Sequence, residues 1–254
     1  MRRVTAYFVP GECTSPRFAA AFAAGAAGDV ASDDHLRDGD VAMFGSPARW
    51  DLLMQARALG RDWYYGDHAY FGRFQYYRVT RNAFQADSLG NADLNLPRRH
   101  GVEIKPWRPR GRHILVCPPD EPFEALMIRA GVLAVPGWGS RTVDLLRQFT
   151  DRPIVVRGRD QAGKRPLAQD LEDCWAVVTF MSNAAVEAAM AGVPVLATGP
   201  CAARAIGRTD LSQIENPIYP ERTQFVANLL AQQWTMPELA DGTCWRALQA
   251  RRTS

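Results

Sequence analysis

The segment 177–195 carries residues suited to binding a phosphate group. An apolar run is followed at once by Ser182 and Asn183, and then by small residues up to Gly192. This pattern predicts a buried strand, a tight turn and a helix start, where free backbone N–H groups favour a phosphate or diphosphate. Glu187, in the first turns of that helix, is suited to accept hydrogen bonds from vicinal hydroxyls such as those of a ribose. An ordinary strand-to-helix crossover capped by Ser or Asn explains the spacing equally well.

A second group of reactive side chains lies in the aromatic stretch 63–73. His68, next to Asp67, is a candidate general base for an acceptor hydroxyl, because imidazole titrates near neutral pH. Neighbouring strand residues point to opposite faces, so Asp67 need not orient His68. Gly66 and Gly72 indicate a tight backbone, as in a loop that lines a ligand. The alternative is a structural histidine inside an aromatic cluster.

Arginine supplies nearly all the positive charge, because Lys105 and Lys164 are the only lysines in a chain with net charge +3. Arginines alternate with aromatic residues over 63–81, and between 98 and 112 the only acidic residue is Glu103. Such a surface suits a polyanion, with arginines on phosphates and aromatic rings on exposed bases. A solvated loop in an arginine-rich protein explains the same charges. The candidate acceptor-binding residues are Tyr65, Arg73, Arg78 and Arg81.

The composition predicts a globular protein. The chain has 254 residues, of which 47% are hydrophobic and 22% charged, enough for one large or two small domains. The N-terminal apolar run is too short for a signal peptide, and no run is long enough to span a bilayer. The five cysteines have neither redox nor metal-binding spacing, which favours the reducing cytoplasm. No Asp-x-Asp motif follows an expected strand, so we expect no metal.

Strand-like and helix-like segments alternate along both halves of the chain, which predicts an α/β fold with parallel sheets and helices on both faces. Ser15 and Ser46 are expected helix caps, each followed by a proline that opens the helix. Polar, arginine-rich residues 90–112 are expected to connect two facing Rossmann-like domains, residues 1–108 and 109–254. The expected strands are 4–9, 40–44, one from 63, 113–117, 153–156, 175–180 and 194–197. The expected helices are 17–27, 48–59, 140–149, 167–171 (or a turn), 183–191, 224–230 and 237–248.

The pattern Ser-Asn-x-x-x-Glu-Ala-x-x-x-Gly-Val-Pro-Val, from Ser182 to Val195, resembles the nucleotide-binding signature of GT-B glycosyltransferases. It is especially similar to capsule-polysaccharide-type transferases and related phage (bacteriophage) proteins, over about residues 133–200. Many GT-B enzymes are longer, so the resemblance implies a pared-down acceptor domain. It also implies that the C-terminal helices return to the first domain, with Trp234 and Trp245 as packing anchors.

The resemblance also implies roles for individual residues. Ser182, Asn183 and Ala184 would contact the donor diphosphate, and Glu187 would hold the donor ribose. Thr198 and Gly199, after the next strand, would lie against the same ligand. The cationic contacts implied for the diphosphate are Arg157 and either Lys164 or Arg165.

The function implied by the resemblance is that of a metal-independent glycosyltransferase with no cofactor beyond a nucleotide-diphosphate sugar, UDP-sugar being the first choice. Its acceptor would be a polyanion, either DNA carrying a modified base, which must be flipped out of the duplex, or an anionic glycan. One alternative is a sugar-nucleotide epimerase of the same architecture. Another is a non-catalytic protein that binds nucleic acid or sugar. The sequence leaves the sugar, the stereochemistry and the oligomeric state open.

Overall fold

The structure, a computed structural model, describes residues 3–45, 49–86 and 89–251. The chain forms two compact units: unit 1 comprises Met1–Ala86 and Gln232–Ser254, and unit 2 comprises Asp87–Ala231. This division differs from the expected boundary at residue 108. The reason is that the backbone N–H groups of Lys105 and Arg108 donate to carbonyls of Met190 and Gly192, at 3.0 and 2.8 Å. The arginine-rich connection is therefore part of unit 2.

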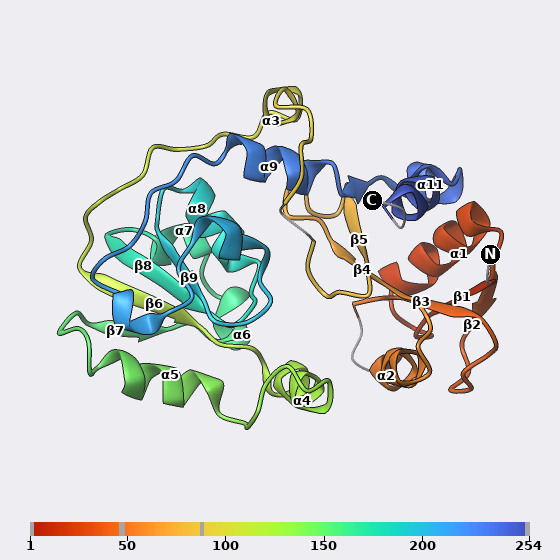
Figure 1. Cartoon of the computed structure of the whole chain (residues 1–254), viewed down its shortest axis with the longest axis horizontal. Helices are drawn as coiled ribbons and strands as arrows, with labels where there is room; N and C mark the ends of the chain where they lie inside the picture. Colours follow the sequence, from red (N-terminus) through yellow and green to blue (C-terminus); the bar gives the residue numbers. More distant parts are fainter. Residues whose placement is uncertain (1–2, 46–48, 87–88, 252–254) are drawn as a thin grey trace. The chain divides into compact units, whose positions relative to one another are not determined.

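Unit 1 contains a six-stranded sheet in the order β10-β5-β4-β3-β1-β2. The four strands from β4 to β2 are parallel, whereas β5 is antiparallel to both β4 and β10. Helices lie on both faces of this sheet (Figure 1). Its strands are β1 (Val4–Tyr7), β2 (Asp29–Ala31), β3 (Asp40–Phe44), β4 (Trp63–His68), β5 (Tyr77–Arg81) and β10 (Gln233–Trp234). Its helices are α1 (Thr14–Ala26), α2 (Trp50–Ala58), α10 (Met236–Ala240) and α11 (Thr243–Ala250).

Aromatic side chains dominate the core of unit 1. The ring of Trp245, on α11, lies 5.8 Å from that of Phe22 on α1 and 5.2 Å from that of Tyr64 on β4. Trp234 belongs to the same buried cluster. Burying a large aromatic side chain stabilises the fold by about 2 kcal/mol or more. The segment 232–251 is thus an integral part of this core.

Of the two helix caps expected in unit 1, one is wrong and the other lies outside the described residues. Ser15 is not an N-cap, because α1 begins at Thr14 and the Ser15 hydroxyl accepts a hydrogen bond from the Val9 N–H at 3.1 Å. The cap expected at Ser46 and the helix start at Pro47 lie outside the described residues.

Unit 2 contains a four-stranded parallel sheet in the order β7-β6-β8-β9, with helices on both faces (Figure 1). Because β7 and β8 lie on opposite sides of β6, the direction of strand addition reverses between β6 and β8. Its strands are β6 (His113–Cys117), β7 (Ile154–Val156), β8 (Cys174–Thr179) and β9 (Val195–Ala197). Its α-helices are α3 (Leu96–Arg99), α4 (Glu121–Arg129), α5 (Trp138–Leu146), α6 (Arg159–Ala162), α7 (Leu167–Asp170), α8 (Ala184–Met190) and α9 (Thr223–Leu230). Two short 3-10 helices are Ala202–Ile206 and Leu211–Gln213.

These elements match the α/β class expected from the sequence, with parallel sheets covered by helices on both faces. Helices α3, α4 and α6 and strands β2, β5 and β10 were not predicted. In the part of the chain that the structure describes, no helix is both long and apolar enough to cross a membrane.

Candidate functional site

The turn between β8 and α8 lies at the carboxyl end of the unit 2 sheet. The hydroxyl of Thr179, the last residue of β8, donates to the Cys117 carbonyl at the end of β6, at 2.7 Å. The same oxygen accepts the N–H of Ser182 at 3.2 Å, and the Ser182 hydroxyl accepts the N–H of Ala184 at 3.2 Å. Two side-chain hydroxyls thus fix the backbone where α8 begins.

The predicted diphosphate contacts are brought together in this turn. Ser182, Asn183 and Ala184 are consecutive and half-buried, and Glu187 is exposed on α8. Ala185 and Ala188 are fully buried on the other side of the helix. The small residues of α8 therefore serve the packing of the helix on the sheet, while its first turn stays accessible.

Thr198 and Gly199 lie beside this turn, after β9. Their N–H groups donate to the carbonyls of Thr179 and Phe180, at 3.1 and 2.9 Å. A β-carbon at position 199 would lie 2.7 Å from the Phe180 ring and carbonyl oxygen, so only glycine allows this approach. Packing against β8 thus explains Gly199, and its N–H is already used.

Trp138, which is not among the predicted site residues, also contacts this region. Its indole N–H donates to the Thr198 hydroxyl at 3.0 Å, and it is the buried first residue of α5. The backbone N–H groups of Gly137 and Trp138 donate to the two carboxylate oxygens of Glu124 on α4, at 3.0 and 2.7 Å. A glycine followed by an aromatic at a helix start is the sequence signal that could have drawn attention to it.

The cationic residues near β7 differ in how accessible they are to a diphosphate. The Arg157 guanidinium is buried, forms an ion pair with Asp170 and donates to the Arg165 carbonyl at 2.7 Å. Asp170 also pairs with the Arg165 side chain. A diphosphate at Arg157 would have to compete with these contacts. The Lys164 side chain is 76% exposed and lies 3.9 Å from Asp160, so it is accessible to an anion.

Two buried cysteines of unit 2, Cys117 and Cys174, are not set up as nucleophiles. Burial raises the pKa of the Cys117 thiol, and also that of Cys174, to about 12. At neutral pH these thiols stay protonated, and the thiolate is the reactive form. In the described residues, no group of three or more His, Cys, Asp or Glu side chains is placed to hold a metal ion.

In unit 1, His68 ends β4 at the carboxyl end of the parallel strands. Its ring centroid lies 4.7 Å from that of Phe74, 5.3 Å from that of Phe44 and 5.9 Å from that of Tyr77. Its Nδ1 atom is buried without a hydrogen-bond partner in the described part of the chain. Burial lowers the pKa of His68; the nearby cations Arg73 and Arg78 lower it further, against the opposing effect of Asp67. The imidazole is therefore neutral at pH 7, as a general base must be.

Asp67 is occupied by other partners. Its carboxylate accepts from Arg78 at 2.6 Å and from the backbone N–H of His68 at 2.7 Å. The imidazole of His68 is thus positioned by aromatic rings, and Asp67 is positioned by a buried arginine.

The four predicted acceptor-binding residues separate into internal and exposed side chains. Tyr65 is buried against Phe84, at 5.1 Å between rings. The side chain of Arg78 is 1% exposed and donates to the Phe84 carbonyl. Arg81 pairs with Asp62 at 2.7 Å. Tyr65 and Arg78 could meet an acceptor only if the structure opened.

Arg73, the fourth of these residues, is exposed. Its guanidinium lies 5.2 Å from the centre of the Phe74 ring. It is the most exposed member of the predicted set, since the side chain of Arg81 is 24% exposed and paired with Asp62.

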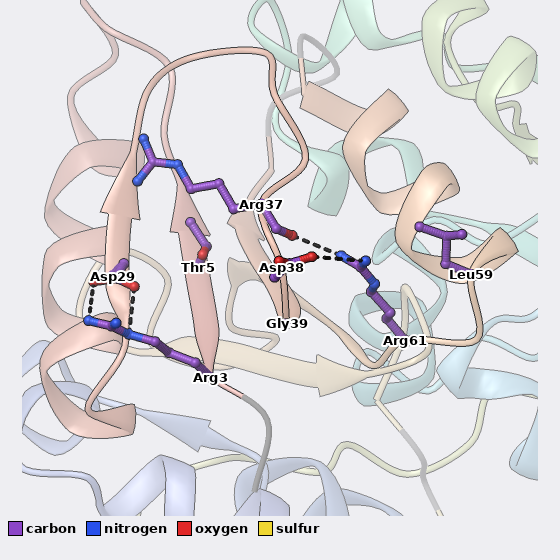
Figure 2. A pocket seen from close by; sticks show the side chains of 8 residues that line it. All are labelled: Arg3, Thr5, Asp29, Arg37, Asp38, Gly39, Leu59 and Arg61. Atoms are coloured by element: carbon purple, nitrogen blue, oxygen red, sulfur yellow. Dashed lines mark hydrogen bonds and ion pairs between the residues drawn. The ribbon is translucent and has the colours of Figure 1, made fainter.

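A depression of about 670 Å³ lies at the opposite, amino end of the unit 1 strands (Figure 2). Arg3 pairs with Asp29 there, and Arg61 reaches Asp38 at 3.5 Å. Ligands of open parallel sheets bind beyond the carboxyl ends of the strands. This depression is at the other end of the strands and is therefore not the candidate site. Its lining is Arg3, Thr5, Asp29, Arg37, Asp38, Gly39, Leu59 and Arg61.

A scan against models of protein families and a search of curated proteins gave no match. Solved structures do match. KpsC of Thermosulfurimonas dismutans, described as a β-Kdo 2,7 transferase, has a TM-score of 0.53 and 13% identity, over 99% of this chain and 100% of that chain. A second KpsC structure from the same organism, described as a β-Kdo 2,4 transferase, has a TM-score of 0.44 and 12% identity, over 90% and 98%. The first match shows that the fold is similar to that of a solved glycosyltransferase, and the resemblance expected from the sequence is confirmed at the level of the fold.

Proposed function

We propose that this chain is a glycosyltransferase of GT-B type, in which unit 2 binds a nucleotide-sugar donor and unit 1 binds the acceptor. The proposal is supported by a fold similar to that of a solved Kdo transferase. It is also supported by the nucleotide-binding pattern from Ser182 to Val195. The transfer joins an acceptor hydroxyl oxygen to the anomeric carbon, and the nucleotide leaves with the bonding electrons.

The observation that carries the proposal is the position of the Ser182 turn. In open α/β sheets, ligands bind where the direction of strand addition reverses. In unit 2 that reversal lies between β6 and β8, and the turn follows β8 directly. The hydrogen bond from Thr179 to Cys117 joins the ends of these two strands. A turn built by hydroxyls at this point suits a phosphate-bearing ligand.

Within the proposed donor site, Ser182, Asn183 and Ala184 would meet the phosphates and Glu187 the ribose. Because Arg157 is engaged by Asp170, we assign the neutralisation of the leaving group mainly to the exposed Lys164. No step of this scheme uses a metal or another cofactor, and a UDP-sugar is the first donor to test.

In unit 1 we assign the general base to His68, with Nε2 accepting the proton because Nδ1 is buried. The acceptor we propose is a glycan. DNA carrying a modified base was suggested by alternating arginine and aromatic residues, but Tyr65 and Arg78 are buried in unit 1. The solved structure of similar fold is described as a transferase of the sugar Kdo.

A thermal-shift panel with CMP-, UDP-, GDP- and dTDP-sugars tests the donor assignment. Glu187→Ala should weaken the binding of the donor about tenfold, because a hydrogen bond to a charged group is lost. Glu172→Ala is the matched control, since it removes another exposed carboxylate of unit 2. The proposal is wrong if no nucleotide sugar raises the melting temperature.

A transfer assay followed by mass spectrometry tests the reaction itself. His68→Ala should lower turnover and leave donor binding unchanged. If the wild type converts or hydrolyses the donor without any acceptor, the protein is an epimerase or a hydrolase rather than a transferase. If both Glu187→Ala and His68→Ala transfer sugar normally, the site assignment is wrong.

A further inference from the structure

The hairpin between β4 and β5, residues 69–76, presents an aromatic ring to solvent. Phe74 is 69% exposed and has a φ of 75°, in the left-handed region that residues with a β-carbon avoid. The N–H groups of Gln75 and Tyr76 both donate to the Gly72 carbonyl at 3.0 Å, and the Tyr77 hydroxyl donates to the Phe74 carbonyl at 3.1 Å. This unfavourable conformation is therefore held by specific hydrogen bonds. Backbone strain that the surroundings maintain is a feature of ligand-binding segments.

Two polar groups accompany this ring. The Phe74 ring centroid lies 4.7 Å from that of His68, at the carboxyl end of β4. The Arg73 guanidinium lies 5.2 Å from the ring centre. Unlike Arg78 and Arg81, which are paired with aspartates, Arg73 makes no ion pair among the described residues. An exposed ring, an available cation and an imidazole thus lie together; we call Arg73, Phe74 and His68 the hairpin platform.

We propose that the hairpin platform binds the acceptor as a sugar residue bearing a carboxylate, with its apolar C–H face on Phe74 and its carboxylate on Arg73. The proposal rests on the transferase function and specifies its acceptor. An exposed aromatic ring offers an apolar face to the ring of a sugar. A guanidinium binds a carboxylate in bidentate geometry. A hydroxyl of a sugar held in this way lies next to the proposed base, His68.

A single exposed ring favours a sugar over a nucleic-acid strand. Proteins that bind single strands stack successive bases on several aromatic rings along a basic groove. The other aromatic side chains of residues 63–77 are buried or half-buried, and Phe74 is the exposed ring. One ring and one cation match one anionic sugar unit.

The test uses four probes with the full chain, and binding is measured by ligand-observed NMR. The probes are the methyl glycoside of Kdo, its carboxyl methyl ester, a neutral methyl hexoside and a single-stranded oligonucleotide. Phe74→Asn removes the ring and keeps the left-handed turn, because asparagine tolerates positive φ. We expect the acid glycoside to bind about tenfold more weakly to Phe74→Asn, and within about twofold of wild type to Phe74→Tyr.

Arg73→Gln should abolish the preference of the protein for the acid over the ester, and Arg73→Lys should retain part of it. The control is Phe149→Ala, which removes another exposed aromatic side chain, in unit 2, and should change nothing. Unchanged affinity of Phe74→Asn for the acid glycoside would overturn the platform. Equal affinity of the wild type for acid and ester would overturn the carboxylate contact. Stronger binding of the oligonucleotide that depends on Phe74 would overturn the choice of a sugar.

The donor panel separates this inference from the transferase proposal. If nucleotide sugars bind but the acid glycoside does not respond to Phe74→Asn, the hairpin platform is wrong and the transferase stands. If no nucleotide sugar binds while the glycoside still binds at Phe74, the platform stands as a sugar site and the transferase proposal fails.

Discussion

The two units differ in the kind of side chain found at the carboxyl ends of their parallel strands. In unit 2 the side chains there are small and already paired: Thr179 and Ser182 fix the turn, and Thr198 accepts from Trp138. In unit 1 the corresponding position carries an imidazole among aromatic rings, and the Nδ1 of His68 has no partner in the described residues.

This difference fits the proposed function, in which unit 2 binds the donor and unit 1 binds the acceptor. A site made of backbone and hydroxyl groups suits the part of a ligand that many donors share, such as phosphate. A site made of aromatic rings and an available arginine suits the part that distinguishes one acceptor from another. The units also differ in their buried charges. In unit 2 both partners of the Arg157–Asp170 pair are buried, whereas in unit 1 the partner of the buried Arg78, Asp67, is partly exposed.

Replacing Asp170 should have the largest effect on the free energy of unfolding, and it tests the buried ion pair of unit 2. Asp170→Leu would leave the buried Arg157 guanidinium without its carboxylate, and the Asp170 side chain is only 2% exposed. The free energy of unfolding should fall by about 3–5 kcal/mol, measured by urea denaturation.

The matched control is an exposed ion pair, Arg99–Asp93, in the same unit. Arg99→Ala should change the free energy of unfolding by less than about 1 kcal/mol. A loss of similar size in both variants would show that the buried pair is not distinct from the surface pairs.

Gly66→Ala tests the aromatic packing of unit 1. A β-carbon at Gly66 on β4 would lie 2.3 Å from the ring of Phe18, which is fully buried. The ring would have to move within a packed core, so the free energy of unfolding should fall by about 1–3 kcal/mol. In unit 2, Gly163→Ala meets nothing within 4 Å and should be neutral or slightly stabilising. Equal effects of both substitutions would contradict the tight packing of the ring.

Much of unit 2 follows from the sequence, because its strands are continuous apolar runs. The expected strand 113–117 coincides with β6, and the expected 175–180 overlaps β8. The position of the Ser182 turn follows from the end of β8. The partnership of Arg157 with Asp170 could not be foreseen, because it depends on how the segment after β7 folds back.

Unit 1 was less predictable for a physical reason. The sequence Tyr-Arg-Val-Thr-Arg of β5 has arginine at a buried position, so it does not look like a core strand. Only the pairing of β5 with β4 brings Arg78 to Asp67, and Tyr65 is buried against Phe84. Phe74 was not predicted as a site residue, because its exposure and left-handed backbone are properties of the folded hairpin.

Thr235→Ala tests how much the segment 232–251 contributes to the stability of unit 1. Thr235 caps α10: its hydroxyl accepts the Glu238 N–H at 3.4 Å, and the Glu238 carboxylate accepts the Thr235 N–H at 2.8 Å. Loss of this capping box should lower the free energy of unfolding by about 1 kcal/mol, and Thr235→Ser should restore most of it. No change in either variant would mean that α10 does not contribute to the stability of unit 1.

The smallest expected effect is the pH dependence that His68 gives to the free energy of unfolding. Its pKa is lowered in the folded chain, first by burial, so the unfolded chain takes up the proton more readily. The stability contributed by neutral His68 is therefore complete above the unfolded pKa of about 6.5, and it is lost as the pH falls towards the folded pKa. Since the imidazole is only half-buried, the change should be smaller than that caused by any destabilising substitution above.

NMR titration of the His68 ring measures this directly, with His68→Gln to assign its signal. Because Arg73 is one of the cations that lower the pKa of His68, Arg73→Gln should raise that pKa, whereas Arg99→Ala in unit 2 should not. An acidic sugar on Arg73 should shift the pKa in the same direction as Arg73→Gln, because its carboxylate offsets the guanidinium charge. A pKa of His68 that responds to neither change would mean that Arg73 and His68 do not act together, and unit 1 would lose the feature that distinguishes it from unit 2.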